Sequence, residues 1–154
     1  MLREVETRTG PRWGDHAREV LQRSGHHKGA AREQLIELLS RQDCALSAQE
    51  IEDALRSDKG GERPVGRASI YRALDLLRDH ELINRLDLGD GTARYEVADP
   101  AGEHHHHLVC DRCGRLVAFD DPALEQAIDR VSERLGMRVS SHDVVLRGEC
   151  ADCD

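Results

Sequence analysis

The chain has 154 residues and a mass of 17.3 kDa, which is enough for one domain or two small ones. Aromatic residues make up only 3% of the sequence, which excludes a site built from rows of stacked rings. The net charge is −8, no apolar run could span a membrane, and the N-terminus lacks a secretory signal, so we expect a cytoplasmic protein whose cysteines bind metal.

Charge is distributed unevenly along the chain. Residues 1–80 hold 14 basic and 14 acidic side chains, whereas residues 81–154 hold 8 and 16. The second half also contains four of the five cysteines and five of the nine histidines. An acidic region rich in such ligands can hold cations, and a neutral region with local basic stretches can contact an anionic polymer. The sequence therefore predicts two domains with different tasks.

The first half has the pattern of a helical domain. Residues 1–13 are polar, and we predict a mobile arm there. Apolar side chains at helical spacing then predict helices over residues 15–25, 30–41, 47–55 and 68–80. The third helix should begin at a capping box, Ser47-Ala-Gln-Glu50.

The helices are followed by a change of period. Residues 82–88 and 92–97 alternate around Gly89-Asp90-Gly91, which predicts a β-hairpin. Three helices followed by a hairpin form a winged helix-turn-helix. We therefore expect a DNA-binding domain over residues 1–98.

Residues 99–102 are of types that favour a turn, and we predict a hinge there between the two domains. We expect a smaller α/β domain over residues 103–154, so the fold class is α+β. Its predicted elements are strands over residues 108–109 and 116–119, a helix over 121–136 and a final strand over 137–147.

Two Cys-x-x-Cys motifs carry the strongest chemical signal: Cys110 with Cys113, and Cys150 with Cys153. Each motif can present two thiolates to a tetrahedral centre, the geometry that Zn²⁺ prefers. A redox dithiol or two disulfides are the alternatives. A redox motif usually opens a helix, however, whereas Cys110 and Cys113 bracket a turn between strands. We therefore predict one structural Zn²⁺ with no open coordination position.

Four consecutive histidines precede the strand that leads to Cys110. Because side chains alternate along an extended chain, His105 and His107 should serve one site, and His104 and His106 another. Further imidazole and carboxylate donors are available at Glu96, Glu125 and His142. Mixed nitrogen and oxygen ligands suit Zn²⁺, Fe²⁺, Mn²⁺ or Ni²⁺. The alternative is a solvated histidine loop without metal.

The segment Gly66–Leu74 carries the signal for nucleic-acid binding. Its first residues would begin the second helix of the helix-turn-helix, whose start enters the major groove. We expect DNA contacts from Arg67, Ser69, Tyr71 and Arg72. Arginines can reach phosphate or guanine, and a tyrosine ring can pack on a thymine methyl. The alternative is an amphipathic helix with a solvated basic face.

Over residues 25–153 the chain resembles the ferric uptake regulator (Fur) family of bacterial metal-dependent repressors. The matching motifs are Ser47–Glu50, Ile70–Leu74, Tyr95-Glu96, His104–Cys110 and the final Cys-x-x-Cys. The resemblance implies a winged-helix N-terminal domain, a C-terminal dimerisation domain, and a homodimer that binds a pseudo-palindromic operator in double-stranded DNA.

The resemblance also implies roles for single residues. The four clustered cysteines resemble the structural zinc ligands, and Glu96, His105 and His107 resemble the sensing site beside the hinge. Ala45 stands where the family usually supplies a histidine to that site, and His80 is our first choice of replacement. A second site would comprise His104, His106, Glu125 and His142. Tyr71 and Arg72 resemble recognition contacts, and Lys28 and Arg32 lie on the helix that touches the DNA backbone.

The expected function is a repressor of metal-uptake genes that binds DNA when a regulatory metal is bound. That metal would be Zn²⁺ or Fe²⁺, with Mn²⁺ and Ni²⁺ as further options. A peroxide sensor of the same fold is an alternative, although Ala118 stands where such sensors place an acidic residue. A metal-storage protein is another, but it would not need the helix of Tyr71 and Arg72. No His-Glu-x-x-His motif is present, so we do not expect an enzyme.

Overall fold

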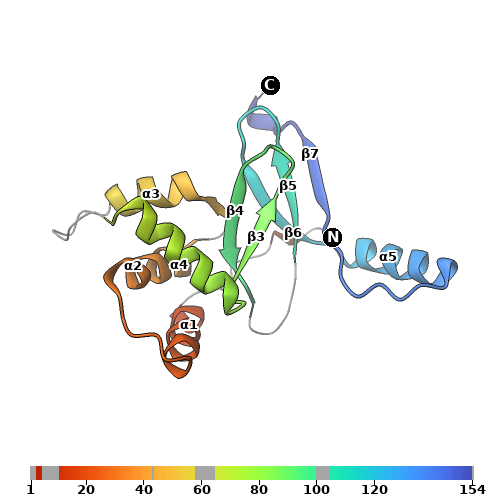
Figure 1. The fold of residues 1–154 in the computed structure, drawn as a ribbon. Helices are drawn as coiled ribbons and strands as arrows, with labels where there is room; N and C mark the ends of the chain where they lie inside the picture. The colour runs from red at the N-terminus through yellow and green to blue at the C-terminus, as the bar shows by residue number, and fades with distance from the viewer. Residues whose placement is uncertain (1–2, 5–10, 43, 58–64, 100–104, 154) are drawn as a thin grey trace. The chain divides into compact units, whose positions relative to one another are not determined.

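The structure, a computed structural model, describes residues 3–4, 11–42, 44–57, 65–99 and 105–153 (Figure 1). The chain divides into two compact units. The winged-helix unit comprises Thr7–Glu103, and the C-terminal unit combines Met1–Glu6 with His104–Asp154. Across the described ranges, no helix has both the length and the apolar character needed to cross a membrane.

Four helices form the bulk of the winged-helix unit. They are α1 (Pro11–Arg23), α2 (Ala30–Ser40), α3 (Ala48–Ser57) and α4 (Arg67–Asp79). The capping box that starts α3 is confirmed. The Ser47 backbone N–H donates to the Glu50 carboxylate at 2.7 Å, and the Glu50 N–H donates to the Ser47 hydroxyl at 3.2 Å.

The helices pack around one apolar core. Its members include Leu35 and Ile36 of α2, Ile51 of α3, and Leu77 of α4, each less than 2% exposed. Trp13 is also buried, and its indole N–H donates to the Leu82 carbonyl at 3.0 Å. This tryptophan ties α1 to the segment that follows α4.

The predicted arm over residues 1–13 is too long at its C-terminal end, because residues 11–13 belong to a helix. Helix α1 begins at Pro11 rather than at Asp15, because proline suits the first helical position and the following Trp13 fills the core. The arm's residues 1–2 and 5–10 lie outside the described residues.

The predicted hairpin is confirmed as β3 (Ile83–Asp87) and β4 (Ala93–Val97), which pair antiparallel from Ile83 opposite Val97 to Asp87 opposite Ala93. Gly89 and Gly91 have φ values of 78° and 77°, a left-handed conformation that glycine adopts without strain. A short strand that the sequence did not indicate, β2 (Leu46–Ser47), extends the sheet on the other side of β4.

The C-terminal unit is built on a four-stranded sheet in the order β1-β6-β5-β7. Its strands are β1 (Arg3–Glu4), β6 (Leu116–Asp120), β5 (His106–Cys110) and β7 (Val145–Gly148). Strands β5 and β6 pair antiparallel, whereas β5 and β7 run parallel. Arg3 and Glu4, which the sequence placed in the arm of the DNA-binding domain, therefore pair with this sheet instead.

One helix, α5 (Pro122–Leu135), follows β6, and a short 3-10 turn, η1 (Ala151–Cys153), ends the unit. The Asp121 carboxylate caps α5 by accepting the backbone N–H groups of Ala123 and Leu124, and Gly136 closes the helix with a φ of 62°.

The predicted final strand over residues 137–147 is wrong in extent, because only Val145–Gly148 pairs. Its partner β5 offers a ladder from His107 to Cys110 and no further. Residues 100–102 of the predicted hinge lie outside the described part of the chain, so the hinge stays a prediction.

Candidate metal centres and nucleic-acid interface

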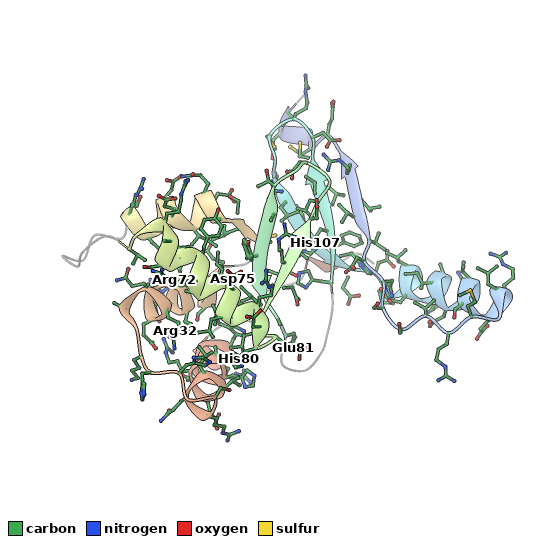
Figure 2. All side chains as sticks on the ribbon, in the orientation of Figure 1. Arg32, Arg72, Asp75, His80, Glu81 and His107 are labelled. Carbon is green, nitrogen blue, oxygen red and sulfur yellow. The ribbon has the colours of Figure 1, made fainter. Side chains whose placement is uncertain are left out.

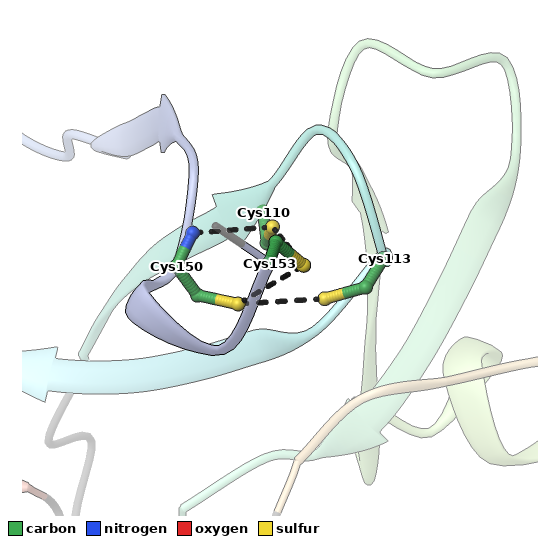
Figure 3. A group of neighbouring side chains, drawn as sticks. All are labelled: Cys110, Cys113, Cys150 and Cys153. Atoms are coloured by element: carbon green, nitrogen blue, oxygen red, sulfur yellow. Dashed lines mark hydrogen bonds between the residues drawn. The ribbon is translucent and has the colours of Figure 1, made fainter.

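The structure brings the four predicted cysteine ligands together (Figure 3). Cys110 ends β5, Cys113 lies in the following turn, Cys150 precedes η1, and Cys153 is the last residue of η1. The sulfur–sulfur distances are 3.7 Å for Cys113–Cys150, 3.9 Å for Cys110–Cys153 and 3.4 Å for Cys150–Cys153. Four sulfurs about 2.3 Å from a tetrahedral Zn²⁺ would lie about 3.8 Å apart. The donor set therefore fits one zinc ion.

The thiols of this cluster have pKa values shifted in opposite directions. Backbone N–H groups of Cys113 and Cys150 point at the Cys110 sulfur and lower the pKa of that thiol to about 6. The neighbouring thiols of Cys150 and Cys113 raise the pKa of Cys153 to about 12. A divalent cation would compensate the repulsion among four thiolates and displace the remaining protons.

Ion pairs fasten the two cysteine-bearing segments to each other. Three arginine–carboxylate pairs join the chain after β5 to the chain at or beyond β7: Asp111–Arg147, Arg115–Asp152 at 2.7 Å and Arg112–Glu149 at 3.8 Å. The Arg112 guanidinium also donates to the Cys153 carbonyl. These contacts hold the two segments that carry the cysteines next to each other.

A second donor group lies between β5 and α5. The Nε2 atom of His106 is 2.6 Å from Oε1 of Glu125, and Nε2 of His142 is 3.1 Å from Oε2 of the same carboxylate. His106 is only 1% exposed and packs against Phe119. Three of the four residues predicted for the second site are thus neighbours. The fourth, His104, lies outside the described residues.

The other two histidines of the run lie together. The rings of His105 and His107 are 4.8 Å apart, whereas the intervening His106 reaches Glu125. The alternation predicted for the described histidines is therefore present. Glu96 is a buried residue of β4 in the winged-helix unit, so its place beside these histidines stays a prediction.

His80, the predicted replacement ligand, caps the C-terminal end of α4. Its Nε2 atom lies 3.1 Å from Nε2 of His26. Both histidines belong to the winged-helix unit, and the sequence analysis gave His26 no role. Its only sequence signal is its position directly after the glycine that ends α1.

Helix α4 exposes two of the residues predicted to contact DNA, Tyr71 and Arg72 (Arg72 is labelled in Figure 2). Tyr71 is 45% exposed although it is a large aromatic residue, and Arg72 is exposed beside it. The Arg72 guanidinium donates to the Ser69 hydroxyl at 3.2 Å, one turn back on the same face. This face carries hydrogen-bond donors and an aromatic ring.

Arg67, also predicted to contact DNA, is held by α3. Its Nε donates to the Glu52 carboxylate at 2.8 Å, and its Nη2 donates to Gln49 at 2.9 Å. The Glu52 side chain is only 5% exposed and also pairs with Arg56. The hydrogen bond from Arg67 lowers the pKa of Glu52, and Glu52 in turn raises the pKa of Arg67. The sequence analysis missed Glu52, whose spacing of four residues from Arg56 is its only signal.

The two remaining predicted DNA contacts flank the start of α2. Lys28 is exposed in the loop before the helix. Arg32 lies in the first turn, where its guanidinium donates to the His27 carbonyl at 2.8 Å. Both cations therefore lie at a helix N-terminus, where backbone N–H groups also favour a phosphate.

Comparisons with known proteins agree with this architecture. The sequence model of the ferric uptake regulator family matches residues 23–147. The ferric uptake regulation protein of Vibrio anguillarum is 30% identical over 135 residues, which cover 87% of each chain. That of Helicobacter pylori is 29% identical over 139 residues, covering 90% of this chain and 89% of the relative.

Solved structures of regulators show the same fold. The Helicobacter pylori ferric uptake regulator, described as having three functional metal-binding sites, superposes with a TM-score of 0.78 at 28% identity, covering 98% of this chain and 96% of that one. The Vibrio cholerae regulator gives a TM-score of 0.74 at 28% identity over 86% and 98% of the two chains. The chain therefore belongs to the ferric uptake regulator family, whose members are metal-responsive transcription regulators rather than enzymes.

Proposed function

We propose that this protein is a cytoplasmic repressor of metal-uptake genes, which as a homodimer binds a pseudo-palindromic operator when its regulatory metal is bound. The observation that carries the proposal is the division of chemistry between the units. The winged-helix unit exposes Tyr71 and Arg72 on one helix, whereas the C-terminal unit gathers cysteine, histidine and carboxylate ligands.

The cysteine cluster would hold a structural Zn²⁺. Four sulfur ligands fill a tetrahedral site and leave no position for substrate or water. Because Cys110 and Cys113 come from the β5–β6 connection and the other pair from the end of the chain, zinc would join segments that few apolar contacts hold. Its role is to fold the unit.

Regulation would occur at a site of His105, His107 and Glu96. The two histidines already contact each other at the start of β5, and Glu96 lies on a wing strand of the other unit. A cation bound by all three would favour one arrangement of the two units. It can shift that equilibrium only by its difference in affinity between the arrangements. Zn²⁺ or Fe²⁺ suits these ligands, as do Mn²⁺ and Ni²⁺.

The group of His106, Glu125 and His142 would form a second site with His104. Its ligands come from β5, from α5 and from the segment before β7. A metal there would fix α5 against the sheet and would tune the sensitivity of the protein rather than switch it.

A homodimer is supported by the apolar surface of the C-terminal unit. Helix α5 buries no residue among those described, and Leu135, Met137 and Leu146 are 66%, 69% and 46% exposed. We infer that these side chains belong to a surface that a partner covers, because large exposed apolar patches mark interaction sites. A second copy of the chain, which supplies the same face, would cover them.

The test uses duplex DNA selected from a random pool by the zinc-loaded protein. Operator affinity is then measured in buffered Zn²⁺, Fe²⁺, Mn²⁺ and Ni²⁺. We expect metal-dependent binding in the wild type and loss of the metal dependence in His107→Ala. Arg72→Ala should weaken binding with every metal and reduce the salt slope, because each phosphate contact contributes about −0.9 to it.

His16→Ala is the matched control, because it removes an exposed histidine outside all of these groups. It should leave affinity and metal response unchanged. Equal operator affinity with and without every metal would contradict the proposed function.

A further inference from the structure

Two helices of the winged-helix unit end at a pair of facing histidines. The Nε2 atoms of His26 and His80 are 3.1 Å apart, and their rings meet edge to face at 79° with centroids separated by 5.1 Å. Both side chains are partly buried. The residues are 54 positions apart in sequence, so the fold itself creates the pair (His80 is labelled in Figure 2).

The backbone at His26 is fixed by the closure of α1. Gly25 adopts a φ of 79°, its N–H donates to the Gln22 carbonyl at 3.1 Å, and the His26 N–H donates to the Leu21 carbonyl at 2.9 Å. This pair of bonds is a Schellman motif, which satisfies the last carbonyls of a helix. The His26 side chain therefore starts from a rigid position.

The backbone at His80 is fixed in the same way by the closure of α4. Glu81 has a φ of 56°, and its N–H donates to the Arg78 carbonyl at 2.8 Å. The Leu82 N–H donates to the Leu77 carbonyl at 2.9 Å. Two equivalent helix ends thus hold the two imidazoles close together before any ligand arrives.

The position of the pair favours positive charge. A helix carries a partial charge of about −0.5 at its C-terminus, and here two helices of 13 residues end at the same place. The arginines in the last turns of the two helices are already paired with carboxylates, Arg23 with Glu19 and Arg78 with Asp75. They therefore do little to neutralise the negative helix ends. A cation held by the imidazoles would interact favourably with both helix ends.

We propose that His26 and His80 bind one divalent transition-metal ion through their Nε2 atoms. Imidazole nitrogens about 2.0–2.1 Å from one ion, at angles of about 90–110°, would lie about 2.9–3.4 Å apart. The observed 3.1 Å falls in this range. Zn²⁺, Ni²⁺ and Cu²⁺ accept such ligands readily.

This site would be weaker and more labile than the other groups. Within the described ranges, the clusters of three or more potential ligands do not include His26 or His80, so water would complete the coordination. An ion there would join the start of the loop that leads to α2 to the end of the recognition helix α4. Filling the site would stabilise the winged-helix unit only at higher metal concentrations than the cysteine cluster needs.

The experiment uses the full-length, zinc-loaded protein and Ni²⁺ as the probe. Equilibrium dialysis at saturating Ni²⁺ compares the wild type with His26→Gln and His80→Gln. The control is His27→Gln, which removes an exposed histidine adjacent to the pair. We expect each variant of the pair to bind one ion fewer per chain, and the control to bind as many as the wild type.

A second measurement locates the ion. Paramagnetic Ni²⁺ should broaden the imidazole NMR signals of His26 and His80 together. Ni²⁺ should also raise the melting temperature more in the wild type than in either variant, as followed by the fluorescence of Trp13, the only tryptophan.

A loss of one ion in His80→Gln but not in His26→Gln would place His80 in another site and overturn the proposal. An unchanged stoichiometry in both variants, with the pair acting only as a hydrogen bond, would also overturn it. Operator DNA takes no part in these measurements, so a failure here is distinct from a failure of the proposed repressor function.

Discussion

The two units are stabilised by different chemistry. The winged-helix unit buries a cluster of fourteen residues, all apolar or aromatic. In the described part of the C-terminal unit, the buried residues are Val109, Phe119, Cys110, His106 and His107. Three of these five are potential metal ligands, so the second unit gains far less from burial of apolar surface than the first.

This difference indicates how each unit reaches a stable fold. A core of interlocking side chains is sufficient by itself, and the winged-helix unit has one. A small sheet with a helix whose described side chains are at most partly buried needs another source of stability, either bound metal or a partner. The same sequence thus contains one unit that should fold on packing alone and one that should depend on its ligands.

The largest expected effect is the loss of the cysteine-bound zinc. Cys110→Ser should remove the ion and unfold the C-terminal unit, because structural Zn²⁺ contributes about 10–16 kcal/mol to small zinc-binding folds. Zinc content and hydrogen exchange measure the result, and exchange should increase in β5–β7 while α1–α4 stay protected. Cys44→Ser, in the other unit, is the control and should retain zinc. Full zinc content in Cys110→Ser would contradict the inference that the C-terminal unit depends on zinc held by these cysteines.

Truncation of a leucine to alanine should have different consequences in the two units: it should lower the stability of one and weaken dimerisation through the other. Leu77→Ala, at a fully buried position of α4, should destabilise the winged-helix unit by about 2–5 kcal/mol. Leu135→Ala, at a residue 66% exposed on α5, should leave unit stability nearly unchanged and weaken the dimer. Trp13 fluorescence in urea and sedimentation equilibrium measure these two outcomes. A dimer unaffected by Leu135→Ala would argue against α5 as an interface.

A smaller effect is expected at Glu52, a buried carboxylate of α3. Glu52 pairs with Arg67 and Arg56, and its pKa is lowered chiefly by the hydrogen bond from Arg67. A lowered pKa means that the stabilisation is present above the ordinary value of 4.5 and is lost as pH falls through the folded value. Glu52→Gln should therefore lower stability at pH 7 and flatten its decline in acid.

Urea unfolding followed by Trp13 fluorescence at pH 7 and in acid measures this change. Asp53→Asn, an exposed carboxylate on the same helix, is the control and should change stability less. Because Arg67 begins the helix that carries Tyr71, Glu52→Gln should also weaken operator binding. An acid decline as steep in Glu52→Gln as in the wild type would contradict the role given to this pair.

The sequence predicted the elements that have strong local signals and missed those that depend on distant partners. The capping box at Ser47 and the glycines of the hairpin turn specify their structures within a few residues, and both are present. Strand β1 could not be predicted, because Arg3 and Glu4 acquire their partners from β6, more than 100 positions away. Trp13 was misassigned for the same reason, since its hydrogen-bond acceptor is at Leu82.

The candidate sites follow the same rule. The alternation of the histidines depends on neighbouring residues alone. The cysteine cluster was indicated by the local spacing within each Cys-x-x-Cys motif, although the fold brings the two motifs together over 37 or more positions. Glu52 and His26 were missed because their partners, Arg67 and His80, are brought to them by tertiary structure. The sequence alone therefore gives little indication of the role of an ionisable residue whose partner lies on another helix.

The smallest expected effect is a gain in stability at the end of α4. Glu81 has a φ of 56°, a left-handed conformation that costs a residue with a side chain about 1–2 kcal/mol. Glu81→Gly removes this strain but makes the unfolded chain more flexible, which offsets about 0.4–1 kcal/mol. We expect a net gain of about 0.5 kcal/mol, or a melting temperature about 2–4 °C higher for the winged-helix unit.

The control for this gain is Glu81→Ala, because the glutamate also places a negative charge at the negative end of a helix. Alanine removes the charge and keeps the backbone strain, so the difference between the two variants gives the strain less the cost of the more flexible unfolded chain, without any effect of charge. A thermal scan followed by Trp13 fluorescence reports the unit in which the change lies. If alanine stabilised the protein as much as glycine, removal of the charge rather than of the backbone strain would be the cause. The left-handed conformation at residue 81 would then carry no measurable cost in stability.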